Sequence, residues 1–392
     1  MKRYILTLII AVFALMQAAA QTYDNLWKQA DIIARKDKPR SEIGVMKKII
    51  SKASAAKDYG QLLAAEMRQM TLWKEISADS LTPNVKRMEA EALKTNDPML
   101  KAVRYAVLGK VYHDNPYGIE VDELMDFDLK AIMFEENELI NKTEYTQADM
   151  LAAECCILKA VELKGIKADI TAGLSLGEYA ALVASGALDF ADAMKLVRKR
   201  GIYMENEVPA GKGTMAAVIA LDAAVIDDIC AKITEESGKV VSAANYNCPG
   251  QIVISGYRES VEAAMPLLKE AGAKLVTLLN VSGPFHSPML KGAGDKLALE
   301  LKNVRFNNPQ IPYINNVAAE VVTDNTSISD TLKRQVYSPV RWQQTMEKML
   351  EDGVENFYEI GPGKTLAGFM KRIDRSKKVI TINTVEDLET LA

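Results

Sequence analysis

Histidine and cysteine are scarce in this sequence. Only two histidines, His113 and His286, occur among 392 residues, so chemistry that needs an imidazole has just two candidates. The four cysteines have neither the spacing of a zinc site nor that of a disulfide framework, and we interpret them as buried thiols. A formal net charge of −4 gives no indication of a nucleic-acid partner. We therefore expect two or three globular domains with sizeable cores, without a metal site and without nucleic acid.

Long apolar runs are absent except at the start of the chain. There Lys2 and Arg3 precede an apolar run from Tyr4 to Met16, and three alanines at 18–20 come before Gln21. The run is too short to cross a bilayer, and the small residues fit a cleavage site, so residues 1–20 predict a secretory signal peptide. The alternative is an apolar first helix of the fold. No other run is long enough for a membrane span.

Residues 21–116 predict an α-helical segment. Ile43, Met46 and Ile49 have helical spacing, and no catalytic arrangement of side chains is visible in this part of the sequence. The run from Tyr23 to Lys28, together with that from Tyr59 to Leu63, gives residues 1–115 a loose resemblance to the start of exported macroglobulin-like proteins.

Residues 120–392 predict a different architecture, an α/β domain with a mainly parallel sheet, because expected strands and helices alternate. Within it, residues 213–281 form a unit of their own in the order βαββαβ, with strands expected at 214–221, 240–244, 251–255 and 273–281 and helices at 223–236 and 260–271. This order is that of a ferredoxin-like unit. We expect an inserted subdomain whose rim overhangs Ser175.

A Gly-x-Ser-x-Gly pattern centres on Ser175. A strand is expected at 168–172 and a helix at 178–185, so Ser175 would lie on a tight turn that lifts its hydroxyl clear of the backbone. A Cβ at Gly173 or Gly177 is expected to crowd this turn, and the following helix N-terminus favours negative charge. The pattern alone is weak, since glycine at about 7% places it in roughly one chain in ten of this length, and an ordinary turn is the alternative.

The imidazole that would activate this serine is expected to be His286. It follows a predicted strand, where α/β folds place their chemistry, whereas His113 lies in the helical segment. A lone histidine is more often structural than catalytic. Here, however, a serine on a suitable turn is already present.

At this point the sequence shows a family resemblance. Residues from about 120 to 385 resemble the malonyl-CoA:acyl-carrier-protein transacylases, the acyltransferases that load fatty acid synthesis. The matches are ordered along the chain, at residues 143–147, 173–179, 200–204, 213–217, 244–251, 284–286, 335–342 and 359–363. The resemblance implies a hydrolase-like parallel-sheet acyltransferase domain with a ferredoxin-like insert, preceded by the α-helical segment.

The resemblance also implies catalytic roles. Ser175 resembles the nucleophile that takes malonyl from coenzyme A as an ester. His286 resembles the general base and later the general acid. Gln335 resembles the group that orients the imidazole, with its neutral amide in the place of an aspartate.

Recognition of malonyl is implied for two further residues. Arg200 resembles the residue that binds the free carboxylate, which suits a planar donor with two prongs. Its neighbours Arg198 and Lys199 allow the alternative of a solvated basic helix face. Phe285 resembles the bulky residue that excludes branched acyl chains.

The remaining site residues concern the oxyanion hole and the pocket. Leu176 N–H resembles one donor of the hole, and Gln147, Asn247 and Gln251 are expected to line the pocket. Family members open with a strand that ends in a Gly-Gln-Gly-x-Gln turn, which supplies the second donor, and this pattern is not present in the chain. We therefore expect an impaired enzyme, as a natural fusion or as a join of unrelated fragments.

The function implied is malonyl transfer from coenzyme A to the phosphopantetheine thiol of acyl carrier protein. A serine hydrolase or thioesterase of the same chemistry and a catalytically dead chimera are the alternatives. The resemblance implies no cofactor, with malonyl-CoA as substrate, acyl carrier protein as partner and a monomeric state. Its chemistry implies the cytoplasm, which conflicts with the signal-like start.

Overall fold

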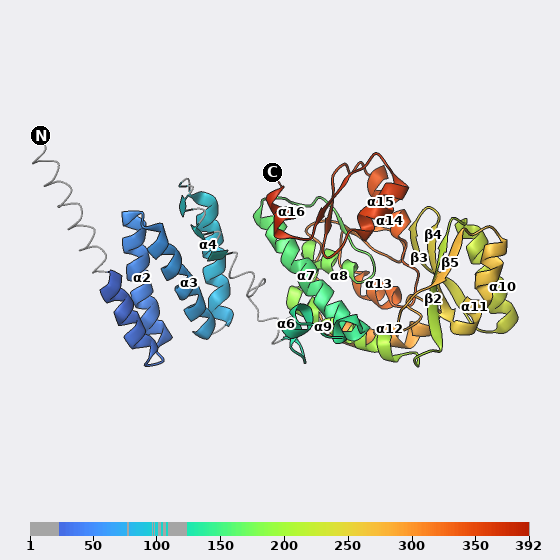
Figure 1. The fold of residues 1–392 in the computed structure, drawn as a ribbon, viewed down its shortest axis with the longest axis horizontal. Coiled ribbons are helices and arrows are strands. Elements are labelled where there is room, and N and C mark those ends of the chain that lie inside the picture. Colours follow the sequence, from blue (N-terminus) through green and yellow to red (C-terminus); the bar gives the residue numbers. More distant parts are fainter. Residues whose placement is uncertain are drawn as a thin grey trace, which may run out of the picture. The chain divides into compact units, whose positions relative to one another are not determined.

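The chain forms two compact units, Met1–Glu120 and Val121–Ala392, in the computed structural model (Figure 1). The structure describes residues 23–76, 78–95, 97, 99–100, 103–104, 107–108 and 124–391. The expected signal peptide over residues 1–20 and the alternative base His113 both lie outside the described residues.

The first unit is helical, as the sequence predicts. Residues 23–34 form a helix, followed by α2 (Pro39–Ala56), α3 (Tyr59–Ile76) and α4 (Ala78–Lys94). Helices α2 and α3 are joined by a tight turn in which Lys57 has φ 53°. Ile43, Met46 and Ile49 are buried in the core between them, which confirms the helical spacing read from the sequence.

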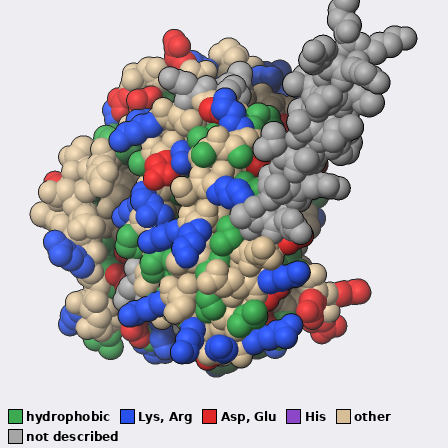
Figure 2. Space-filling model, turned by 90° about the vertical axis from the view of Figure 1, so that its left-hand side faces the viewer, with side chains coloured by type: hydrophobic (Ala, Val, Ile, Leu, Met, Phe, Trp, Pro, Cys, Tyr) green, Lys and Arg blue, Asp and Glu red, His purple; other side chains and the backbone are tan. Residues whose placement is uncertain are grey.

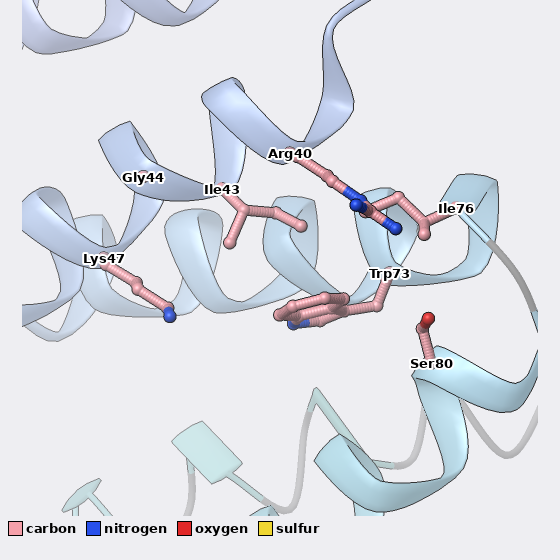
Figure 3. Close-up of a pocket in the computed structure, with 7 residues that line it drawn as sticks. All are labelled: Arg40, Ile43, Gly44, Lys47, Trp73, Ile76 and Ser80. Atoms are coloured by element: carbon pink, nitrogen blue, oxygen red, sulfur yellow. The ribbon is translucent and has the colours of Figure 1, made fainter.

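Two tryptophans complete this helical core. Trp27 packs at its edge and donates its indole N–H to Gln61 Oε1 at 2.7 Å. Trp73 of α3 packs in the same core and also borders a cavity of 380 Å³. Figure 3 shows Lys47 and Arg40 to either side of the Trp73 ring.

The surface of the first unit is rich in cations. Helix α2 carries four basic residues and a single acidic one, Glu42, which is buried and paired with Arg68 at 2.8 Å. The face in Figure 2 likewise shows many Lys and Arg side chains, whereas hydrophobic side chains are scattered singly. Scattered apolar side chains are normal for a protein surface.

Among the described residues, none of the helices combines the length and the apolar character that a membrane span requires.

The second unit has short strands surrounded by helices. Its helices, apart from those of the insert, are α6 (Leu129–Phe134), α7 (Thr143–Leu163), α8 (Gly177–Ala184), α9 (Phe190–Asn206), α12 (Lys291–Leu301), α13 (Ile328–Gln335), α14 (Trp342–Glu351), α15 (Thr365–Ile373) and α16 (Val385–Glu389). Short turns of 3-10 helix, η2 (Leu139–Asn141) and η3 (Pro288–Leu290), precede α7 and α12.

In the part of the chain that the structure describes, the strands outside the insert form two small sheets. One has the order β1 (Thr171–Ala172), β6 (Tyr313–Ile314) and β7 (Val321–Val322), with β1 parallel to β6. The other pairs β8 (Phe357–Ile360) with β9 (Val379–Ile382) in parallel. Side chains from both sheets pack into one core, which contains Ala172, Ile314, Phe357 and Val379. The expected strand over 168–172 is therefore shorter than predicted, because only its last two residues pair with β6.

The insert has the predicted βαββαβ order. Its elements are β2 (Gly213–Ile219), α10 (Ala223–Ser237), β3 (Val241–Cys248), β4 (Gln251–Tyr257), α11 (Arg258–Glu270) and β5 (Leu275–Leu278). The sheet order is β3-β4-β2-β5 and every pairing is antiparallel. Both helices cover the same face of this sheet (Figure 1). The α/β fold class with a ferredoxin-like insert is confirmed.

Candidate active site

Ser175 lies in the turn between β1 and α8. Its φ is +55°, a left-handed conformation that is rare for a residue with a side chain and typical of a nucleophile elbow. A Cβ at Gly173 would come within 1.9 Å of the Gly177 carbonyl oxygen, so only glycine fits there. The expectation for Gly177 was wrong, because a Cβ at that position meets open space at the start of α8.

Asn316 holds this turn through two hydrogen bonds, a role that was not predicted from the sequence. Its Oδ1 accepts the Ser175 main-chain N–H at 2.6 Å, and its Nδ2 donates to the Gly173 carbonyl at 2.7 Å. Asn316 follows β6, the strand paired with β1, and it is fully buried. A polar residue just after a strand in an α/β fold is the only signal that could have pointed to it.

His286 reaches Ser175 from the loop between β5 and η3. Its Nε2 is 2.7 Å from Ser175 Oγ, and its Nδ1 is 2.8 Å from the main-chain carbonyl oxygen of Gln335. A carbonyl can only accept, so Nδ1 carries the proton and Nε2 accepts the hydrogen bond from the serine hydroxyl. The backbone of His286 is also left-handed, with φ +58°. Both members of the pair are thus held in conformations that their surroundings must impose.

The imidazole of His286 is neutral at physiological pH. Burial, and then the nearby Arg200 cation, lower the pKa of His286 to about 4. The residue is only 4% exposed. A neutral imidazole whose Nε2 faces a hydroxyl can take up the serine proton.

Gln335 takes part in the site through different atoms than expected. The interpretation that its side-chain amide orients the imidazole was wrong, because His286 Nδ1 bonds to the main-chain oxygen of this residue. Gln335 ends α13, and carbonyls at the end of a helix lack intrahelical partners and are free to accept. The amide donates instead to Ser175 O and to Glu178 Oε2, at 2.8 Å each.

Arg200 is buried beside the nucleophile. Its Nη2 donates to Ser175 Oγ at 3.0 Å and to Gln335 Oε1 at 2.9 Å, while its Nη1 donates to Gln147 Oε1 at 2.6 Å. Its Nε is buried without a partner among the described residues. At 1% exposure the residue is not part of a solvated basic face, which excludes that alternative for Arg200.

The neighbours of Arg200 on α9 have other surroundings. Arg198 pairs with Asp126 at 2.7 Å and lies over the rings of Phe127 and Tyr145. Lys199 is exposed. Of the three adjacent cations, only Arg200 contacts the serine.

Glu178 is a second buried residue without an assigned role in the sequence. It lies in the first turn of α8 and is fully buried. Its Oε2 accepts from Gln335 Nε2 and from the Asn316 main-chain N–H at 3.1 Å, whereas Oε1 has no partner among the described residues. Burial raises the pKa of Glu178 to about 7. It was visible in the sequence only as part of the motif around Ser175.

The other predicted site residues lie at varying positions. Gln147 is buried on α7 beside Arg200, and Leu176 is the N-cap of α8, where N–H groups lack intrahelical acceptors. Phe285 packs against Met215, Ala244 and Val253 of the insert, and so fastens the His286 loop to that subdomain. Asn247 and Gln251 lie at the β3–β4 hairpin, and among the described residues no hydrogen bond connects them to Ser175, His286 or Arg200.

Together these groups can perform acyl transfer. The serine hydroxyl contacts both a neutral base and a cation. Its backbone turn lies at a helix N-terminus, which favours a developing negative charge. Among the described residues no cluster of three or more His, Cys, Asp or Glu side chains could hold a metal ion. The fold and the site define a serine acyltransferase of the α/β class.

Comparison with known proteins identifies the family. The model of the acyl transferase domain matches residues 119–387. The chain is 45% identical over 271 residues to the malonyl CoA-acyl carrier protein transacylase of Bacillus subtilis, covering 69% of this chain and 85% of that protein. The chain belongs to the family of the malonyl CoA-acyl carrier protein transacylases, which confirms the resemblance seen in the sequence.

Solved structures agree with this assignment. An acyl carrier protein S-malonyltransferase from Vibrio cholerae superposes with a TM-score of 0.69 at 42% identity, covering 74% of this chain and 93% of that one. A malonyl-transacylase in complex with a type II polyketide synthase acyl-carrier protein superposes with a TM-score of 0.67, also at 42% identity, covering 69% of this chain and 87% of the other.

Proposed function

We propose that this chain transfers malonyl from coenzyme A to the phosphopantetheine thiol of an acyl carrier protein, through an ester on Ser175. The observation that carries the proposal is the buried Arg200 guanidinium, 3.0 Å from the nucleophilic oxygen. A malonyl group differs from an acetyl group by a free carboxylate, and a guanidinium is the side chain best suited to bind one. The malonyl transferases to which the chain is similar support the same assignment.

The first half-reaction acylates the serine. His286 Nε2 removes the proton from Ser175 as its Oγ attacks the thioester carbonyl, and a tetrahedral oxyanion forms. Leu176 N–H, at the start of α8, is one donor for that oxyanion. When the C–S bond breaks, the imidazolium returns its proton to the departing thiolate, and coenzyme A leaves as a thiol.

The second half-reaction runs the same chemistry in reverse. The carrier-protein thiol gives its proton to His286 and attacks the ester carbonyl of malonyl-Ser175. Collapse of the new oxyanion breaks the C–Oγ bond, and the imidazolium protonates the serine. The Gln335 main-chain carbonyl keeps Nδ1 protonated throughout and so maintains the required tautomer.

Arg200 determines which acyl group is accepted. In the free enzyme its Nη2 contacts Ser175 Oγ and its Nε has no partner, so guanidinium N–H groups are available close to the reacting atom. The malonyl carboxylate takes up these donors in the acyl-enzyme. Gln147 accepts from Nη1 and Gln335 accepts from Nη2, so the two amides hold the guanidinium in place.

The experiment that tests the proposal is intact-protein mass spectrometry after incubation with malonyl-CoA. A stable adduct with the mass of malonyl, discharged by holo acyl carrier protein, is the expected result. Turnover of malonyl-CoA without carrier protein would instead indicate the serine hydrolase alternative, which has no need of Arg200. Absence of both adduct and turnover would overturn the proposal in favour of a catalytically dead chain.

The proposed reaction defines the partners and needs no resident cofactor. Malonyl-CoA and acyl carrier protein are the substrates, and a similar transacylase has been solved with such a carrier protein bound. Both substrates belong to the cytoplasm, so we propose that the acyltransferase unit acts there.

A further inference from the structure

We propose that Glu178 is a positioning residue for malonyl recognition. It fixes the orientation of the Gln335 side-chain amide, and through it the position of Arg200 beside Ser175. The inference rests on the function proposed above. Glu178 contacts neither the nucleophile's hydroxyl nor the guanidinium by a hydrogen bond among the described residues, so it acts through Gln335.

The amide of Gln335 has two ends of opposite hydrogen-bonding character, and its partners decide which end faces Arg200. Nε2 donates to Glu178 Oε2 and to the Ser175 carbonyl, and both of these atoms accept. Oε1 accepts from Arg200 Nη2 at 2.9 Å. With the amide reversed, donors would face Arg200 and an oxygen would face two acceptors.

Glu178 is held in the acceptor role by a second contact. The same Oε2 also accepts the Asn316 main-chain N–H at 3.1 Å, so it receives two donors, and a proton on this carboxyl would reside on the other oxygen. Oε2 therefore remains an acceptor for Gln335 in either protonation state. The oxygen that Gln335 presents to Arg200 is kept in place by this arrangement.

Gln335 thereby couples the base to the binding group. Its main-chain oxygen orients His286, while its side chain holds Arg200. A buried carboxyl is expensive to desolvate, and an apolar residue of the same size would fill the space at lower cost. The hydrogen-bond pattern gives the reason for a glutamate at this position.

The test compares the rates at which Ser175 is acylated by malonyl-CoA and by acetyl-CoA, in the full chain. Glu178→Met keeps the volume but removes the acceptor, and we expect the malonyl-to-acetyl ratio to fall on the order of 10-fold, the effect of losing one hydrogen bond to a charged group. Glu178→Gln keeps an oxygen for Gln335 and Asn316, and its ratio should stay close to that of the unsubstituted protein. Circular dichroism checks that each variant is folded.

The matched control is Glu154→Met. Glu154 lies on α7 and also has a buried carboxyl oxygen without a partner among the described residues, but it has no hydrogen bond to the site. This substitution should leave the ratio unchanged.

Three outcomes would overturn the inference. In the first, Glu178→Met keeps the original ratio or slows both acylations equally. In the second, the malonyl-to-acetyl ratio falls as far in Glu178→Gln as in Glu178→Met, which would show that the charge of Glu178, and not its acceptor oxygen, is responsible. In the third, the unsubstituted protein forms no malonyl adduct, and the proposed function then fails as well.

Discussion

Glu66 of the first unit and Glu178 of the second are both buried, and the two residues differ in how they are held. Burial raises the pKa of both Glu66, on α3, and Glu178, on α8, to about 7. Glu178 accepts hydrogen bonds from Gln335 and Asn316. Glu66 lies in a helical core, where the Arg104 cation partly offsets the effect of burial and where Oε2 has no partner among the described residues.

The difference shows that a shifted pKa does not by itself mark a functional site. Desolvation raises a carboxyl pKa wherever the residue is buried. Glu178 is different because the side-chain amide of Gln335 connects it to Arg200, which contacts the nucleophile. We therefore expect the chemistry to reside in the second unit, and Glu66 to affect only the stability of the first.

The largest effect is expected at Ser175, where the hydrogen bonds of the active site converge. Ser175→Ala should abolish the acyl-enzyme, because no other hydroxyl has an imidazole at 2.7 Å and a guanidinium at 3.0 Å among the described residues. Loss of such a nucleophile costs on the order of 10⁶ in rate in a serine enzyme. Intact mass after incubation with malonyl-CoA is the measurement.

Ser185→Ala is the control for this substitution. Ser185 is fully buried just after α8, and its hydroxyl donates to the Leu182 carbonyl, away from the site. The adduct should persist in this variant. A malonyl adduct in Ser175→Ala would show that a residue other than Ser175 is the nucleophile.

The sequence was sufficient to predict the elements and the residues that share a motif. The insert appeared with all its strands and helices, since alternation and periodicity are local properties. Asn316 and the role of Glu178 were missed because their partners come from distant parts of the chain, brought together by the pairing of β1 with β6. The Gln335 error has a similar cause, since residue type does not reveal that the main chain makes the contact.

The second-largest effect on the rate of malonyl transfer is expected from the segment before residue 120. The resemblance implies that a second oxyanion donor comes from a Gly-Gln-Gly-x-Gln turn, and losing one donor costs roughly 10²–10³ in rate. Among the described residues, β1 and β8 each have a single sheet neighbour although their side chains share a core. Unpaired strand edges also favour aggregation.

Replacing residues 1–119 with the first segment of a complete relative, such as the Bacillus subtilis transacylase, should therefore raise both the rate of malonyl transfer and the soluble yield. Removing the helical residues should not slow catalysis, because the active-site residues lie in the second unit. If the original chain transfers malonyl as fast as the replacement, another N–H serves as the second donor, and the view of an impaired enzyme is wrong.

A smaller effect is expected at Arg200. Arg200→Ala should slow acylation by malonyl-CoA roughly 10- to 150-fold, the effect of losing a charge-assisted pair worth about 1.5–3 kcal/mol. Acylation by acetyl-CoA should be retained or increased, since acetyl has no carboxylate. Lys199→Ala, at the exposed neighbouring position, should change neither rate. Equal losses for the two acyl groups would make Arg200 a structural residue.

The smallest effect concerns the first unit and is a change of stability alone. The folded-state pKa of Glu66 is raised from 4.5 to about 7, so the folded protein keeps a proton that the unfolded chain releases between these values. The contribution of Glu66 to stability is thus full below about pH 4.5 and is lost as the pH rises to about 7. Glu66→Gln removes this titration. Relative to this variant, the unsubstituted protein should lose on the order of 1–3 kcal/mol of unfolding free energy between about pH 5 and about pH 8.

Urea unfolding of both proteins at the two pH values measures this difference. Glu178 titrates identically in the two proteins, so its contribution cancels and the difference isolates Glu66. Glu75→Gln, at an exposed position of the same helix, should follow the unsubstituted protein. The rate of Ser175 acylation should be the same in all three, because Glu66 has no hydrogen bond to the network among the described residues. An altered acylation rate in Glu66→Gln would show that the helical unit takes part in catalysis, and the division between the two units would no longer hold.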